Sequence, residues 1–133
     1  MNELANYNFK SSTGIVLGTI PDNQKEKIKF YNEVLNCETK VDTILGVPKK
    51  IKYIHVASQK IKRDNHIGYE ITPRMVFYFM DETSVISFSI GIFNSLEKMV
   101  EIFGNPPYDF SIKFIQINKG RERVYTIDIV EDN

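Results

Sequence analysis

The sequence predicts a mainly β, single-domain protein: an OB-like barrel of five strands with one helix between the third and fourth strands, preceded by an N-terminal strand and helix. Runs rich in β-branched and aromatic residues recur after residue 49, and one amphipathic helical pattern interrupts them. The 133 residues are 42% hydrophobic, a size and composition suited to one packed core. We therefore expect a single domain over 1–133, with an extension at 1–48 and a barrel at 49–130.

The extension contains one strand pattern and one helical pattern. Residues 14–20 (GIVLGTI) are rich in β-branched side chains and predict a short strand. Pro21 and Asp22 are typical of the first turn of a helix. The helix that follows has a wide apolar face, formed by Ile28, Tyr31 and Leu35 and by Phe30 and Val34. A turn over 41–46 leads into the barrel.

The barrel elements follow from the alternation of apolar and polar residues and from the turn residues between them. They are a strand at 50–61, a polar loop at 62–70, a strand at 72–80, a tight turn at 81–83, a strand at 84–90, a helix at 91–103 ended by Gly104, and two strands at 111–117 and 123–130 around a turn at 118–120. This order is that of the OB-fold, a five-stranded Greek-key barrel. A simple α+β sheet packed on one helix has the same order and stays open as an alternative.

Alternation along the first three barrel strands assigns their faces, because successive strand residues point to opposite sides of a sheet. We expect these side chains to point inward: Ile54, Val56, Met75, Phe77, Phe79, Ile86, Phe88 and Ile90. The outer face is then expected to carry Tyr53, His55, Gln59, Arg74, Tyr78, Ser87 and Ser89. The outer set holds the polar and half-polar residues, so it is the candidate ligand face.

Charge is balanced overall and unevenly distributed along the chain. There are 17 basic and 17 acidic residues, but residues 49–63 hold six basic residues and no acidic one. A second basic group lies at 119–123, interrupted by one glutamate. Such segregation can give a neutral molecule one positive face, although lysines at sheet edges that keep a protein soluble would produce the same pattern.

Two basic loops and an aromatic face together predict binding of single-stranded nucleic acid. An OB-fold binds its ligand on the outer face, between the loop joining its first two strands and the loop joining its last two. The candidate DNA-binding residues are Tyr53, His55, Lys60, Lys62, Arg63, Tyr69, Arg74, Tyr78, Lys119, Arg121 and Arg123. Aromatic rings stack on unpaired bases and cations neutralise phosphates. The alternative is that Tyr53 and Tyr78 pack under the N-terminal helix or a partner subunit.

Several segments also share the pattern of a known family. They are TPRMVFYF at 72–79, the DE turn at 81–82, ISFSIGIFNSL at 86–96, FGNPP at 103–107, IKF at 112–114, KGR at 119–121, YTI at 125–127 and FYNEVLN at 30–36. The chain resembles, over about residues 28–130, the single-stranded-DNA-binding proteins of phages infecting Gram-positive bacteria. The resemblance implies non-specific binding of displaced strands during DNA replication or DNA recombination, with replication or recombination proteins as partners. The end of the chain, Glu131 to Asn133, departs from the long acidic tails of cellular single-strand-binding proteins, which puts docking to host repair enzymes in doubt.

The sequence predicts neither an enzyme nor a cofactor. His55 and His66 with the single Cys37 do not make a metal-ligand set, and no glycine-rich phosphate loop is present. Adjacent Asp81 and Glu82 suit a turn better than acid–base catalysis. One cysteine, no secretory signal and no apolar run long enough for a membrane span predict a cytoplasmic protein, in the host cytoplasm if phage-encoded. The alternative function is a protein-interaction module, such as a phage inhibitor or assembly factor, using the same face. The sequence leaves a homo-oligomer open.

Overall fold

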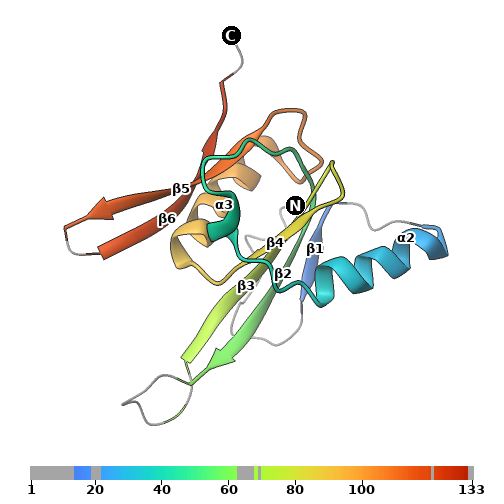
Figure 1. The fold of residues 1–133 in the computed structure, drawn as a ribbon, viewed down its shortest axis with the longest axis horizontal. Helices are drawn as coiled ribbons and strands as arrows, with labels where there is room; N and C mark the ends of the chain where they lie inside the picture. The colour runs from blue at the N-terminus through green and yellow to red at the C-terminus, as the bar shows by residue number, and fades with distance from the viewer. Residues whose placement is uncertain (1–13, 19–21, 63–67, 69, 121, 132–133) are drawn as a thin grey trace.

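The computed structural model describes residues 14–18, 22–62, 68, 70–120 and 122–131 (Figure 1). In chain order the elements are β1 (Ile15–Leu17), α2 (Gln24–Lys29), the π-helix η1 (Phe30–Leu35), the 3-10 helix η2 (Val41–Ile44), β2 (Ile51–Ile61), β3 (Glu70–Phe79), β4 (Ser84–Ser87), α3 (Ile90–Phe103), β5 (Ile112–Lys119) and β6 (Glu122–Ile129). The predicted order of strands and helices is confirmed for these residues, and the protein is mainly β with antiparallel sheets.

Two antiparallel sheets form the framework. The first has the order β1-β2-β3-β4, and the second is the β5-β6 hairpin. Each of the two long hairpins projects from the body as an arm (Figure 1). We call the projecting end of the first hairpin, residues 58–62 and 70–73, the β2–β3 arm. The end of the second, residues 116–119 and 122–125, is the β5–β6 arm.

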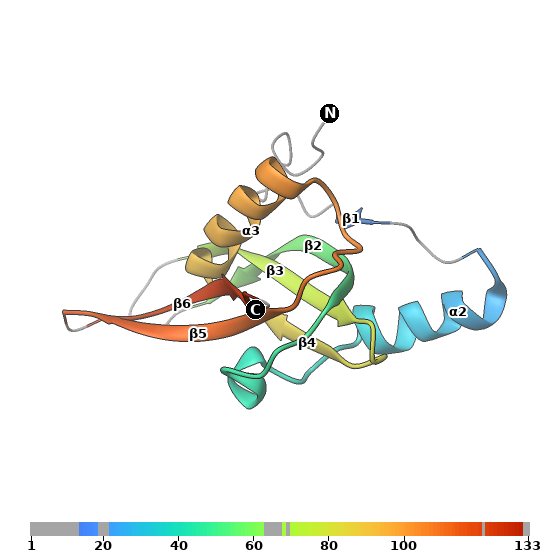
Figure 2. The same ribbon diagram turned by 90° about the horizontal axis from the view of Figure 1, so that it is seen from above.

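The four-stranded sheet is covered on both faces. One face packs against α3 and β5-β6 (Figure 2), in a core cluster that includes Ile54, Phe77, Leu96 and Phe114. The opposite face packs against the helix formed by α2 and η1, in a second cluster of Val34, Tyr53, Val76, Tyr78 and Ile86. Because both faces are buried, a strand residue can be inaccessible whichever way it points.

A closed five-stranded barrel is not found in the described part of the chain. β5 joins the start of β2 through a bridge, in which the backbone N–H groups of Lys49 and Ile112 each donate to the other's carbonyl oxygen at 2.8 Å. No such ladder joins β4 to β6 among these residues. The free edge of β4 is instead occupied by the preceding connection, since the Ile86 N–H donates to the Thr39 carbonyl at 2.8 Å. At Ile86 this edge is therefore paired with the connection and not with β6.

The third barrel strand is shorter than predicted, and its faces are reversed. β4 ends at Ser87, because the chain turns at Ser89, whose side chain accepts a hydrogen bond from the Ile92 N–H and caps α3. In the β3-β4 register Ser87 lies opposite Met75 and Ile86 lies opposite Val76. Ile86 therefore belongs to the second cluster, Phe88 packs against that cluster, and half-exposed Ile90 begins α3. The inward assignment of Ile86, Phe88 and Ile90 is wrong, whereas the faces predicted for β2 and β3 are confirmed.

The predicted helices are confirmed with small shifts of their bounds. Asn23 caps α2 by accepting the Glu26 N–H at 2.8 Å, and Gly104, at φ +80°, ends α3 as expected. The turn predicted at 41–46 contains the short helix η2. None of the helices in the described ranges is long and apolar enough to span a membrane.

Candidate nucleic-acid interface

The two tyrosines predicted to stack on bases stack on each other and are buried. Tyr53 and Tyr78 lie on neighbouring strands, with ring centroids 4.7 Å apart and planes 6° apart, and only 2% and 1% of their surfaces are exposed. The Phe30 ring of η1 covers Tyr53 at a centroid distance of 5.5 Å. Burial raises the pKa of both tyrosines. In this conformation neither ring can contact a base, so the prediction of an open aromatic face is wrong for these residues.

Arg74 contributes to the attachment of the covering helix. Its Nη2 donates to the Leu35 carbonyl at 3.1 Å, and the Ser84 hydroxyl donates to the Glu33 carbonyl at 2.7 Å. The last carbonyls of a helix lack partners inside the helix, so these two side chains cap it from the sheet. A cation at this end also interacts favourably with the helix dipole. Arg74, predicted as a phosphate ligand, is a capping residue in the described conformation.

His55 lies at the margin of the same face and is half-buried. Its ring packs edge-on against the Phe30 ring, with the ring centroids 6.3 Å apart, and its buried Nδ1 has no hydrogen-bond partner among the described residues. Burial, with a smaller contribution from the charge on Arg74, holds the pKa of His55 below its usual value. The imidazole is therefore biased toward its neutral form, which does not suit a phosphate ligand.

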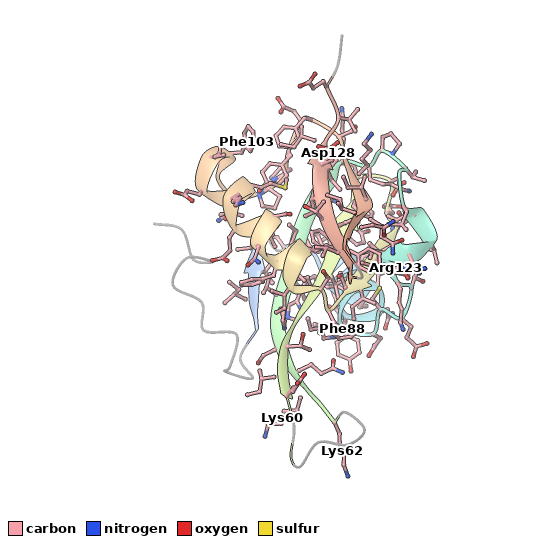
Figure 3. The ribbon with its side chains drawn as sticks, turned by 90° about the vertical axis from the view of Figure 1, so that its left-hand side faces the viewer. Lys60, Lys62, Phe88, Phe103, Arg123 and Asp128 are labelled. Carbon is pink, nitrogen blue, oxygen red and sulfur yellow. The ribbon has the colours of Figure 1, made fainter. Side chains whose placement is uncertain are left out.

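The predicted cations on the two arms are exposed where the structure describes them. Lys60 and Lys62 lie at the end of β2, and Arg123 lies on β6 (Figure 3). The two ion pairs found between described residues, Lys29–Glu82 and Lys49–Asp81, include none of these three. Lys119 ends β5, and its side chain is outside the described part, as are the predicted residues Arg63, Tyr69 and Arg121. In Figure 3 Phe88 is drawn between Arg123 and the two lysines.

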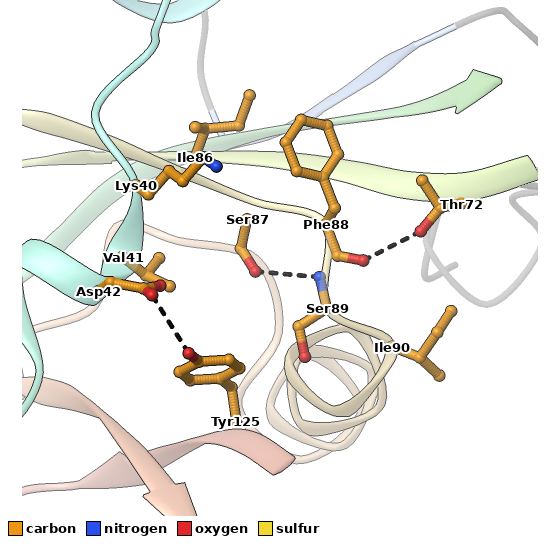
Figure 4. A pocket seen from close by; sticks show the side chains of 10 residues that line it. All are labelled: Lys40, Val41, Asp42, Thr72, Ile86, Ser87, Phe88, Ser89, Ile90 and Tyr125. Carbon is orange, nitrogen blue, oxygen red and sulfur yellow. Dashed lines mark hydrogen bonds between the residues drawn. The ribbon is translucent and has the colours of Figure 1, made fainter. Parts of the chain in front are cut away.

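A cleft of about 410 Å³ opens where the two arms leave the body (Figure 4). The β2–β3 arm contributes Thr72 and the β5–β6 arm contributes Tyr125. The remaining lining residues come from the end of β4, the start of α3 and the connection around η2: Lys40, Val41, Asp42, Ile86, Ser87, Phe88, Ser89 and Ile90.

The cleft is lined by the Tyr125 ring and by polar groups that are held in place. The Tyr125 hydroxyl donates to Asp42 Oδ2 at 3.2 Å, and the Thr72 hydroxyl donates to the Phe88 carbonyl at 3.0 Å. The first bond fixes the Tyr125 ring. The second fixes the backbone at Phe88, whose ring points away from Tyr125 and packs against the cluster of Tyr53 and Tyr78 (Figure 4). Asp42 and Lys40 bring opposite charges to the rim, so the cleft suits a flat, uncharged, hydrogen-bonding group better than a phosphate.

Sequence reasoning missed these cleft residues because it assigned Phe88 to the core and left Tyr125 without a role. A signal was available for Phe88: Ser89 is followed by an apolar helical pattern, which is typical of a helix cap and predicts that the strand ends earlier. No comparable signal marked Tyr125, because its place beside Asp42 depends on the packing of segments that are 83 residues apart.

The acidic turn between β3 and β4 neutralises part of the basic run at 49–63. Lys49 pairs with Asp81, and this hydrogen bond, together with those from Thr83, lowers the pKa of the Asp81 carboxyl to about 2. Lys49 is thereby removed from the surface charge available to a ligand. Within the described ranges, no group of three or more His, Cys, Asp or Glu residues could hold a metal ion.

Comparisons with protein-family models, with curated proteins and with solved structures find no match to this chain.

Proposed function

We propose that this protein binds single-stranded DNA without sequence preference and protects displaced strands during DNA replication or recombination of a phage or mobile element. The observation that carries the proposal is the cleft lined by Phe88 and Tyr125 at the base of two arms with exposed cations, Lys60, Lys62 and Arg123. The proposal moves the stacking residues from Tyr53 and Tyr78 to Phe88 and Tyr125. It keeps the arms as the phosphate-binding elements and the host cytoplasm as the location.

The fold we propose is an open form of the OB-fold. The order β2, β3, β4, α3, β5, β6 matches its five strands and helix, and the Lys49–Ile112 bridge joins its first and fourth strands. OB-folds are partly open barrels that bind nucleic acid between the loops of their first and last hairpins. In this chain those hairpins are the two arms.

The chemistry of the cleft and arms favours unpaired over paired strands. An unpaired base exposes its π face and can stack on an aromatic side chain, whereas the faces of paired bases are hidden in the stack. Stacking on one aromatic side chain contributes roughly 1–3 kcal/mol per base and is tolerant of sequence. Lysine and arginine contacts to phosphate are also independent of sequence. Both contributions predict an affinity that depends on whether the DNA is single- or double-stranded and on the salt concentration, but not on the identity of the bases.

Titration of fluorescently labelled oligo-dT and of a duplex of equal length over a range of salt concentrations tests the proposal. We expect the unpaired strand to bind far more tightly. The variant Lys60→Glu with Lys62→Glu should flatten the slope of log K against log salt by about 0.7 for each phosphate that the protein no longer neutralises. Lys98→Glu, a matched reversal of an exposed lysine on α3, should change the slope less. Equal affinity for both ligands, or a slope that neither variant changes, would contradict single-strand binding through the arms.

One observation favours protein binding as a second candidate function. Ile102 and Phe103, at the end of α3, are 72% and 48% exposed and line a groove of about 550 Å³ between α3 and β6. Large exposed apolar side chains beside a groove are typical of protein interfaces. If this groove binds a protein partner, the affinity for that partner should change little with salt concentration. The substitution Ile102→Ser should lower this affinity.

A further inference from the structure

The outer face of β2, β3 and β4 has the composition of a base-stacking surface, although a helix covers it. Tyr53 and Tyr78 form a flat stack, and the Lys52 ammonium lies over the Tyr78 ring at 5.9 Å from its centroid. Aromatic rings combined with a cation are the elements with which proteins hold unpaired strands. The same rings stabilise the core while the helix covers them and would offer a stacking surface if it moved aside.

The cover makes contacts that a base could replace. Phe30 places its ring 5.5 Å from that of Tyr53, which is within the range of aromatic pairs, and η1 buries Val34 beside it. The Phe30 ring, tilted by 49° to that of Tyr53, thus blocks access of a base to the stack. The helix acts as an internal competitor for the stack.

The α2 part of the cover makes few contacts with the sheet, whereas η1 packs Phe30 and Val34 against it. α2 contributes no buried residue, and Ile28 and Tyr31 point away from the sheet with 52% and 60% of their surfaces exposed. The polar attachments are the exposed Lys29–Glu82 ion pair and the two hydrogen bonds from the sheet that cap η1. Exposed ion pairs stabilise little, and segments with few buried contacts open at low free-energy cost.

The covered face adjoins the cleft. Phe88 lines the cleft and also packs against the cluster that contains Tyr78, and Ile86 belongs to both as well. A strand whose base lies beside Phe88 would therefore reach the stacked tyrosines next, if the helix moved aside. Such continuity makes the two surfaces parts of one path for a nucleic-acid strand.

We propose that the helix over residues 24–35 is a displaceable cover, and that unpaired DNA longer than the cleft displaces it to stack on Tyr53 and Tyr78. This inference rests on the proposed function and adds a second stacking surface and its regulation. Short strands bind in the cleft and leave the cover closed. The affinity for long strands equals the affinity of the open form multiplied by the fraction of molecules in which the cover is open.

A crosslink between the helix and the sheet tests the cover directly. In a Cys37→Ala background, Lys29→Cys and Glu82→Cys replace the ion pair, and a short bis-maleimide joins the two thiols. We expect the crosslinked protein to bind long oligo-dT roughly tenfold more weakly than the same variant without reagent, because the competent state is no longer populated. Its affinity for a short oligo-dT should be unchanged. The single variants treated with the same reagent are the controls, and melting curves verify folding.

Hydrogen exchange of the unmodified protein supplies an independent measurement. Amides of residues 24–35 should exchange faster when long oligo-dT is bound and at an unchanged rate with short oligo-dT. Tight binding of long oligo-dT by the crosslinked protein, or slower exchange in this helix, would overturn the cover while leaving single-strand binding intact. Failure of the unmodified protein to bind any oligo-dT would overturn both proposals.

Discussion

Tyr78→Ala tests how much the buried tyrosine stack contributes to the stability of the protein. The Tyr78 side chain is 1% exposed, and its ring stacks on Tyr53. Deleting a buried ring of this kind removes its transfer free energy and leaves a cavity, which together cost about 3–5 kcal/mol. Native domains are stable by about 5–15 kcal/mol, so the loss is a large fraction of the total. We expect the melting temperature to fall by about 10–25 °C.

Phe88→Ala is the matched comparison, because it removes a ring of similar size from the cleft. Phe88 is only partly buried, so we expect the free energy of unfolding to fall by about 1–2 kcal/mol. The free energy of oligo-dT binding should weaken by roughly 1–3 kcal/mol because the stacking interaction is removed. With short oligo-dT, which binds only in the cleft, Tyr78→Ala is thus expected to lower mainly stability and Phe88→Ala mainly binding.

Thermal melts and oligo-dT titrations measure both effects. Tyr78→Phe keeps the stacked ring and should cost no more than about 1 kcal/mol of stability, which shows that the ring and not the hydroxyl carries the effect. If Tyr78→Ala melts at the wild-type temperature while Phe88→Ala unfolds the protein, the assignment of the buried face is refuted. Loss of stability in Tyr78→Phe as large as in Tyr78→Ala would refute the cavity argument.

Two further predictions concern pH and helix packing. Burial lowers the pKa of His55 in the folded protein. Above the ordinary histidine pKa of about 6.5 the side chain is neutral in both the folded and the unfolded protein. As the pH falls below that value, the unfolded chain takes up the proton first, which lowers the free energy of unfolding. In denaturant titrations between pH 7.5 and 5, the free energy of unfolding of His55→Asn should depend less on pH than that of the wild type. The same pH dependence in both proteins would contradict the lowered pKa of His55. Gly91→Ala would place its Cβ 2.3 Å from the Tyr125 carbonyl oxygen, forcing α3 away from β6 at a cost of about 1–3 kcal/mol. Asn94→Ala, on the exposed side of α3, should be neutral or slightly stabilising in the same melts, and equal effects of the two would argue against the close approach.

Much of the secondary structure could be predicted from local patterns. The alternation in β2 and β3 placed Ile54 and Phe77 inside and Tyr53 and Tyr78 outside, because it reflects the period of a strand and needs no knowledge of neighbours. The same rule failed in β4. Its prediction assumed that serines face solvent, whereas Ser87 faces the core side opposite Met75, where its hydroxyl accepts the Ser89 N–H.

The candidate site was predicted only in part. The exposed cations Lys60, Lys62 and Arg123 lie on hairpin ends, which local sequence locates well. The aromatic residues of the site could not be found in this way. Whether a ring on the outer face of a strand is accessible depends on what covers that face, and here the cover comes from residues 24–35.

The sequence by itself determined the order of strands and helices, the two faces of β2 and β3, and the end of α3 at Gly104, because each depends on residues close together in the chain. The tertiary structure alone decided that Phe30 buries the tyrosine stack, that the edge of β4 is paired with residue 39, and that Tyr125 and Phe88 share a cleft. These outcomes depend on contacts between distant segments. Several packings are compatible with one local pattern, and only the total burial of apolar surface and pairing of backbone groups selects among them.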